Sequence, residues 1–177
     1  MKKFELTSEF VTFLGKKLFR IKALISFGNV KEGELGGYVE KEENLSNDGD
    51  AWVSGNAMVY GDARVFGNAW VSGNAMVSGN AMVYGNAMVS GDAEVYGDAE
   101  VFGDADYATV HGFGSEYRTT TFFRTKAGDI GVRCGCFYGT LDDFRKKVKE
   151  THGDSKTAKE YLMVADLMEF RFSKEEA

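Results

Sequence analysis

Residues 49–108 read GDAWVS, GNAMVY, GDARVF, GNAWVS, GNAMVS, GNAMVY, GNAMVS, GDAEVY, GDAEVF and GDADYA. These hexapeptides follow one another without a gap, with the consensus Gly-[Asp/Asn]-Ala-x-Val-[Ser/Tyr/Phe], and only the last unit departs from it. A fixed period of six residues is typical of parallel β-helices, in which each repeat builds one side of a coil.

The repeat explains how such a coil would form. Side chains alternate along a strand, so Ala and Val share one face and the two variable positions share the other. Gly with Asp or Asn favours a corner, because both tolerate unusual backbone angles. Three hexapeptide sides would close a coil of about 18 residues, with Ala and Val in the core.

This coil length also predicts which corner residues stack. No Asp then lies directly above another Asp, which avoids repulsion between like charges, and Asn ladders can form hydrogen bonds along the axis. The predicted columns are 50/68/86/104, 56/74/92 and 62/80/98.

The run resembles the hexapeptide-repeat family, whose members form left-handed parallel β-helices and include acyltransferases that are often trimeric. The flanking segments 35–40, 43–46, 118–123 and 134–137 are similar to those of short hexapeptide proteins of bacteria, phages and prophages, often labelled transferases. The resemblance implies a mainly β, three-sided, left-handed β-helix.

We expect three parts: an N-terminal β cap at 1–34, the β-helix at 35–111, and a C-terminal α+β unit at 112–177. The cap should contain strands at 10–13 and from Phe19 to Ile25, joined by a turn at 15–17. Leu45 and Val53 lie eight residues apart, which indicates a two-residue bulge near residues 46–47.

The C-terminal unit is predicted to hold a β-hairpin followed by two helices. The hairpin strands are expected at 119–125 and 131–138. Thr140 should cap a helix that ends near Gly153. A second helix at about 155–170 would present an apolar face made of Tyr161, Leu162, Val164, Ala165, Leu167 and Met168.

Composition and net charge disfavour some classes of function. The chain has 177 residues, of which 44% are hydrophobic, and a net charge of −6, which disfavours nonspecific nucleic-acid binding. No apolar run approaches the length of a membrane span, and no secretory signal is recognisable at residues 1–5, so we expect a cytoplasmic protein, in the host cytoplasm if phage-encoded.

The resemblance implies a search for a catalytic histidine, because the family's acyltransferases use one as a general base with an acyl-CoA substrate. No repeat contains His. His111 is the candidate base, with acetyl-CoA as cofactor only under that alternative. His152 is expected to be an ordinary residue at a helix end. Cys134 and Cys136 could be redox-active or half of a metal site, but buried positions in a central strand are favoured, and no metal is expected.

The outward positions of the repeats carry large apolar residues that the core does not need. Such patches usually mark contacts, either with the chain's own caps, with another copy, or with a foreign partner. The third side, with its row of three aromatic residues, is expected to be the most buried. The candidate interface residues are Trp52, Trp70, Met88, Tyr60, Tyr96, Phe66, Tyr84 and Phe102.

We therefore expect a non-catalytic, self-associating protein-binding module of phage or prophage type, a dimer or trimer, with a host defence protein as a candidate target. An acyltransferase and a purely structural spacer are the alternatives.

Overall fold

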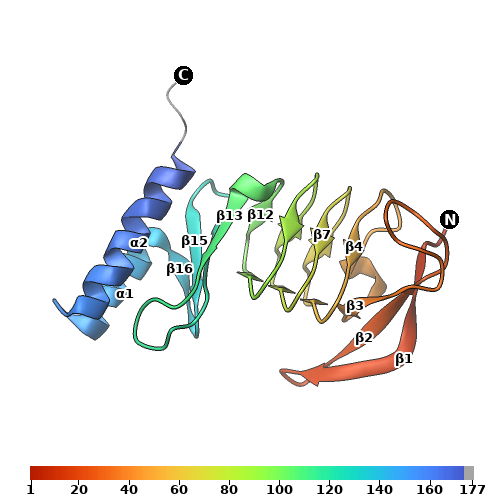
Figure 1. Cartoon of the computed structure of the whole chain (residues 1–177), viewed down its shortest axis with the longest axis horizontal. Helices are drawn as coiled ribbons and strands as arrows, with labels where there is room; N and C mark the ends of the chain where they lie inside the picture. The colour runs from red at the N-terminus through yellow and green to blue at the C-terminus, as the bar shows by residue number, and fades with distance from the viewer. Residues whose placement is uncertain (174–177) are drawn as a thin grey trace.

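The computed structural model describes residues 1–173. Its parts lie in a row: an N-terminal hairpin, a central coil, a C-terminal sheet, and two helices that cover the far end of that sheet (Figure 1). The protein is mainly β, and its coil is a β-solenoid with about 18 residues per turn.

The repeats form short strands that stack into parallel sheets on three sides. Val53 pairs with Val71, which pairs with Val89. These partners are three hexapeptides apart, which confirms the predicted coil length. The left-handed sense of the coil stays a prediction. The strands are β4 (Trp52–Val53), β5 (Met58–Val59), β6 (Arg64–Val65), β7 (Trp70–Val71), β8 (Met76–Val77), β9 (Met82–Val83), β10 (Met88–Val89), β11 (Glu94–Val95) and β12 (Glu100–Val101).

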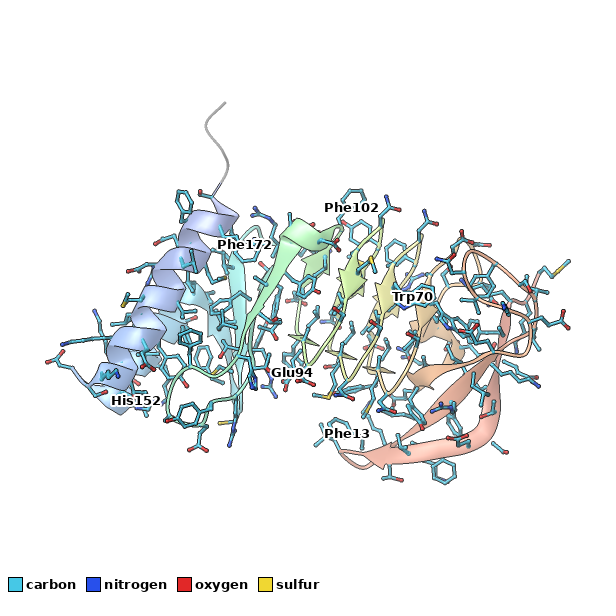
Figure 2. The ribbon with its side chains drawn as sticks, in the orientation of Figure 1. Phe13, Trp70, Glu94, Phe102, His152 and Phe172 are labelled. Carbon is cyan, nitrogen blue, oxygen red and sulfur yellow. The ribbon has the colours of Figure 1, made fainter. Side chains whose placement is uncertain are left out.

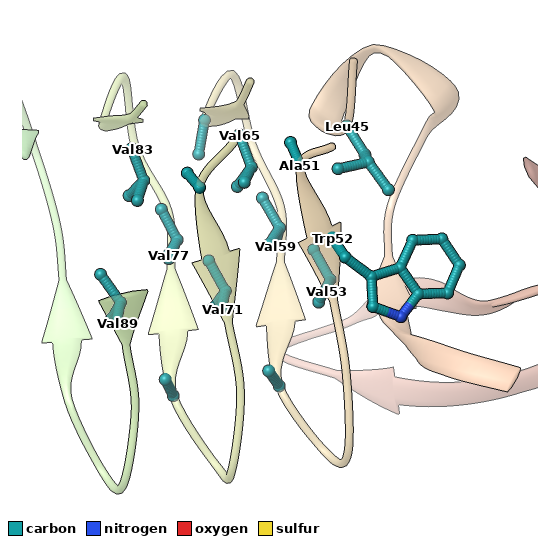
Figure 3. Packing of buried hydrophobic residues seen from close by; sticks show 14 of the residues in the cluster. Leu45, Ala51, Trp52, Val53, Val59, Val65, Val71, Val77, Val83 and Val89 are labelled. Atoms are coloured by element: carbon teal, nitrogen blue, oxygen red, sulfur yellow. The ribbon is translucent and has the colours of Figure 1, made fainter. Parts of the chain in front are cut away.

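The core of the coil is made of the Ala and Val positions of the repeats. Every one of them from Ala51 to Val101 is fully buried, and Figure 3 shows the Val side chains stacked along the axis. The repeat glycines make the corners with positive φ. At Gly73, for example, φ is +69° and an added Cβ would lie 3.0 Å from the backbone of Gly91, so a larger residue would be strained there.

The coil begins before residue 49, as the sequence predicts. β3 (Leu35–Val39) pairs with β5, and η1 (Glu42–Asn44) follows it. Val39 pairs with Val59 and Leu45 bridges to Val65. Each of these spacings is longer by two residues than the regular coil, which confirms the two extra residues between Leu45 and Val53.

The N-terminal cap is an antiparallel hairpin of β1 (Phe4–Phe13) and β2 (Lys16–Ala23). Its strands are longer than predicted, and the second ends at Ala23 rather than Ile25. Because β2 pairs with β3, the hairpin extends one side of the coil into a sheet of order β1-β2-β3-β5-β8-β11.

The predicted C-terminal hairpin is part of a larger antiparallel sheet. Its strands are β13 (Tyr107–Val110), β14 (Thr120–Arg124), β15 (Ile130–Cys134) and β16 (Phe137–Thr140), and they pair in that order. The degenerate last repeat forms η2 (Asp104–Asp106) and the start of β13 instead of another coil strand.

The expectation that Cys134 and Cys136 share a central strand is wrong. The segment 131–138 is interrupted by a turn at Gly135, where φ is +58°. Cys134 therefore ends β15 and is half-buried, whereas Cys136 lies in the turn and is exposed.

Two helices close the C-terminal end. α1 (Leu141–His152) starts at the predicted cap, where the Thr140 hydroxyl accepts a hydrogen bond from the Asp143 amide, and Gly153 caps its end. α2 (Lys156–Phe172) is capped by Ser155. Most of its predicted apolar face is buried, but Leu167 is exposed, which corrects that assignment. Within residues 1–173, no helix has the length and apolar character needed to cross a membrane.

Candidate interaction surfaces

The corner residues form the predicted ladders. Asn56 donates to Asn74 at 3.4 Å, and Asn74 donates to Asp92 at 3.0 Å. Asn80 likewise donates to Asp98 at 3.1 Å. Each amide thus links two coils at the surface. No Asp stacks on another Asp in these columns, because the register of the coil places an Asn between them.

The first coil would expose backbone carbonyl groups that have no preceding strand, and two side chains bind them. The ammonium group of Lys3 donates to the carbonyls of Gly49 at 3.1 Å and Ala51 at 2.7 Å. On another side, the amide of Asn44 donates to the equivalent carbonyls of residues 61 and 63, at 3.1 and 2.8 Å. Both side chains take the place of a missing coil.

Burial changes the acidity of Lys3. Its side chain is almost completely enclosed, with 2% of the residue exposed. This loss of hydration lowers the pKa of Lys3 to about 8, although Asp50 and Asp48 act in the opposite direction. No sequence pattern marks this residue, because its role depends on where the hairpin meets the coil.

The last coil would expose amide groups in the same way, and the chain binds them too. The Met88 amide donates to the Asp104 carboxylate at 2.8 Å, and the Glu94 amide donates to the Thr121 hydroxyl at 2.9 Å. The Phe102 amide donates to a further carboxylate, that of residue 106, at 3.1 Å. These contacts occupy both ends of the solenoid, which disfavours end-to-end extension through the sheets.

Trp52, Trp70 and Met88 stack on one side of the coil and have different surroundings. Trp52 is fully buried beneath the N-terminal segment, where its ring meets that of Phe27 edge to face at 5.5 Å. It is therefore unavailable to a partner, which corrects the expectation for this residue. Trp70 is half-buried and donates to the Ser54 hydroxyl at 3.0 Å, whereas Met88 is 57% exposed.

Tyr60 and Tyr96 lie on a second side, which the chain itself partly covers. The ring of Phe13, near the tip of the β1–β2 hairpin, meets Tyr60 at 5.7 Å. Tyr96 packs against Tyr138 at 4.9 Å, and the Arg133 guanidinium lies 5.1 Å from its ring. Much of this surface is thus an internal contact between the coil and its two caps.

The aromatic row of Phe66, Tyr84 and Phe102 follows one corner of the third side. Phe66 and Tyr84 are stacked at 4.9 Å with an interplanar angle of 8°, and Tyr84 meets Phe102 at 5.3 Å. Phe102 is 60% exposed, at the upper edge of the molecule in Figure 2. The expectation that this side is the most buried is wrong for the single chain, because Phe102 is exposed and Phe66 and Tyr84 are only half-buried.

A further apolar surface lies on α2, and the sequence reasoning assigned it no contact role. Met163, Leu167 and Phe170 are 71%, 56% and 78% exposed. Their spacing of four and three residues places them on one face of the helix. We call these three residues the α2 stripe. The apolar residues on both faces of α2 were the signal that could have revealed it.

The α2 stripe borders a groove of about 890 Å³ between α2 and the coil. Leu167 and Phe170 line one wall, and Met88 lines the wall opposite. The Tyr107 hydroxyl, on β13, donates to the Met88 carbonyl at 2.8 Å and so links β13 to the coil within the groove. The groove is lined by Met88, Ser90, Asp104, Tyr107, Ala108, Thr109, Leu167, Met168, Phe170 and Arg171.

The two histidines lie apart from this groove. His111 is exposed, and its Nδ1 is 3.0 Å from the Thr119 hydroxyl oxygen. His152 lies at the end of α1, 5.8 Å from the ring of Tyr161. In the part of the chain that the structure describes, no three His, Cys, Asp or Glu side chains are grouped so that they could hold a metal ion.

A comparison with known protein families supports the repeat structure of the coil. The model of the YdcK beta solenoid repeat matches residues 51–73, 69–84 and 81–97. No curated protein matches the chain significantly. The matched residues coincide with strands β4 to β11 and their corners. Residues 51–97 are therefore similar to the YdcK beta solenoid repeat.

Proposed function

We propose that this protein is a binding module that self-associates through the α2 stripe and the groove beside it. The observation that carries the proposal is the exposure of three large apolar side chains on a helix whose other face is already packed. Burying them from water would favour association, at roughly 25 cal/mol per Å² of apolar surface.

A second copy of the chain is the partner that the stripe fits best. Met163 and Phe170 lie on either side of Leu167, so two antiparallel copies of α2 would set each Met163 against the partner's Phe170. The Leu167 side chains would then meet near the two-fold axis. A two-fold interface needs this kind of self-complementary surface.

The hydrogen bonds at the two ends of the solenoid favour association through the flank of the molecule rather than end to end. Lys3 and Asn44 already bind the carbonyls of the first coil, and Asp104, Thr121 and Asp106 accept from amides of the last. Sheet addition at either end would have to displace these bonds. Association through side chains on the flank of the molecule requires no such exchange.

The test is the mass in solution as a function of concentration, measured by light scattering for the wild type and for Leu167→Glu. We expect a dimer that dissociates on dilution in the wild type, and a monomer in Leu167→Glu at every concentration. Phe102→Glu is the matched control, because Phe102 is similarly exposed but lies on the coil corner. A monomeric wild type, or dimers that persist in Leu167→Glu, would refute the proposal.

A further inference from the structure

A separate cavity of about 260 Å³ lies within the C-terminal unit, between the loop 114–118, the β15–β16 turn and the two helices. It shares no lining residue with the groove beside the α2 stripe. His152, labelled in Figure 2, marks its place at the end of α1. The lining comprises Ser115, Glu116, Arg118, Cys134, Gly135, Cys136, Phe137, Phe144, Lys147, Val148, Thr151, His152 and Tyr161.

One part of the cavity wall consists of aromatic side chains. Phe144 meets Phe137 at 5.6 Å and Tyr161 at 5.6 Å, the latter pair edge to face. Val148 is buried beside them. An apolar base of this kind favours a flat ring, which can pack edge to face or offset against the aromatic side chains.

The backbone around the cavity is shaped by close contacts. At Gly114, φ is +80°, and an added Cβ would overlap the end of the Tyr161 ring. The loop can therefore approach Tyr161 only with glycine at this position. The Arg118 guanidinium lies against Gly135 of the opposite turn, also at a positive φ, so these glycines hold the loop and the turn at the cavity mouth.

The rim of the cavity is cationic. Arg118 and Lys147 carry positive charges there, and Glu116 carries the single carboxylate among the lining residues. Glu116 is 3.7 Å from Arg118, and Lys147 is the same distance from Glu150, so neither cation is tightly paired. Among the lining residues, cations thus outnumber carboxylates by two to one, in a chain whose net charge is −6.

The geometry points to a binding site for a small aromatic anion, a single ring bearing a carboxylate or phosphate. The ring would occupy the apolar base beside Phe137, Phe144 and Tyr161. The acidic group would lie at the rim, where Arg118 and Lys147 supply hydrogen-bond donors and charge. The volume lies just below the usual range of ligand pockets and suits a ligand of a single ring.

The experiment uses phenyl phosphate as the probe and titration calorimetry as the readout. A ligand of this size should bind with a dissociation constant of about 0.1–1 mM. Inorganic phosphate, which lacks the ring, and benzyl alcohol, which lacks the charge, should each bind at least about tenfold more weakly. Equal binding of inorganic phosphate would overturn the assignment, because binding would then depend on surface charge alone and not on the aromatic ring.

Two neighbouring lysines give a matched pair of variants. Both side chains are exposed on α1, but Lys147 lines the cavity and Lys146 does not. Lys147→Glu should weaken phenyl phosphate binding about tenfold, and Lys146→Glu should leave it within about twofold. The same dissociation constant in both variants would overturn the proposal.

Cys136 provides a second readout that does not depend on either lysine. Its thiol is exposed at the mouth of the cavity, and the chain holds one other cysteine, which is half-buried. Bound phenyl phosphate should slow the alkylation of Cys136 by iodoacetamide in proportion to occupancy. An unchanged alkylation rate at saturating probe would place the probe elsewhere and contradict the assignment.

Discussion

Replacing Lys3 with methionine tests whether a buried ammonium group closes the first coil. Methionine is of similar length and fills most of the same space, but it cannot donate to the carbonyls of Gly49 and Ala51. Two hydrogen bonds from a charged donor are worth about 1.5–3 kcal/mol each, or about 3–6 kcal/mol together. Removing a buried charge recovers part of this, so the net loss of unfolding free energy should be about 2–4 kcal/mol. The melting temperature should then fall by roughly 4–16 °C.

The pH dependence makes this prediction specific. The pKa of Lys3 is about 8 in the folded chain, against 10.5 for an unperturbed lysine. Between these values the folded chain binds fewer protons than the unfolded chain, so its stability rises with pH. The stability gained when the buried ammonium group loses its proton is complete above pH 10.5 and is lost as the pH falls through 8. Unfolding in urea at several values from pH 7 to 9.5 should therefore show the gap between wild type and Lys3→Met widening. Staying below pH 10 avoids Tyr161, whose pKa is raised by burial.

Asn44→Leu is the matched control, because Asn44 binds the equivalent carbonyls on another side through an uncharged amide. We expect it to cost about 2–3 kcal/mol, with no change between pH 7 and 9.5. Parallel stability profiles for the wild type and Lys3→Met would refute the reasoning, since the buried ammonium would then contribute nothing that depends on pH.

Three further predictions concern the coil and are checked by urea unfolding. Asn74→Asp would set two carboxylates together at Asp92 and should cost about 1 kcal/mol at pH 7 and less at pH 3. Asn56→Asp, whose ladder neighbour is Asn74 rather than an Asp, loses only a hydrogen bond of 3.4 Å and should cost less than about 0.5 kcal/mol. Gly73→Ala, at a positive φ and close to the next coil, should cost more than about 1 kcal/mol, whereas stability equal to wild type would contradict the corner geometry. Val77→Ala should cost about 2–3 kcal/mol through lost burial and a cavity, and a change below about 0.5 kcal/mol, the usual range of surface substitutions, would mean that the core collapses around it.

The sequence determined the coil because every constraint on it is local and repeated. Glycine is needed where φ is positive, Ala and Val fill a core too narrow for larger residues, and the register follows from three hexapeptides per coil. The two-residue insertion after Leu45 and the Thr140 cap were also readable, since each depends on a few adjacent residues. The turn at Gly135 was missed because two short strands around one glycine have the same alternation as one long strand.

Only the tertiary structure decided which outward residues are available to a partner. Trp52 and Trp70 occupy the same position in nearly identical repeats, yet Trp52 is buried under Phe27 and Trp70 is not. The capping role of Lys3 and the cavity beside Tyr161 have the same origin, because each forms where segments distant in sequence meet. A repeat fixes the backbone and the core-facing side chains, but the surroundings of an outward side chain depend on where the caps fold back onto the coil.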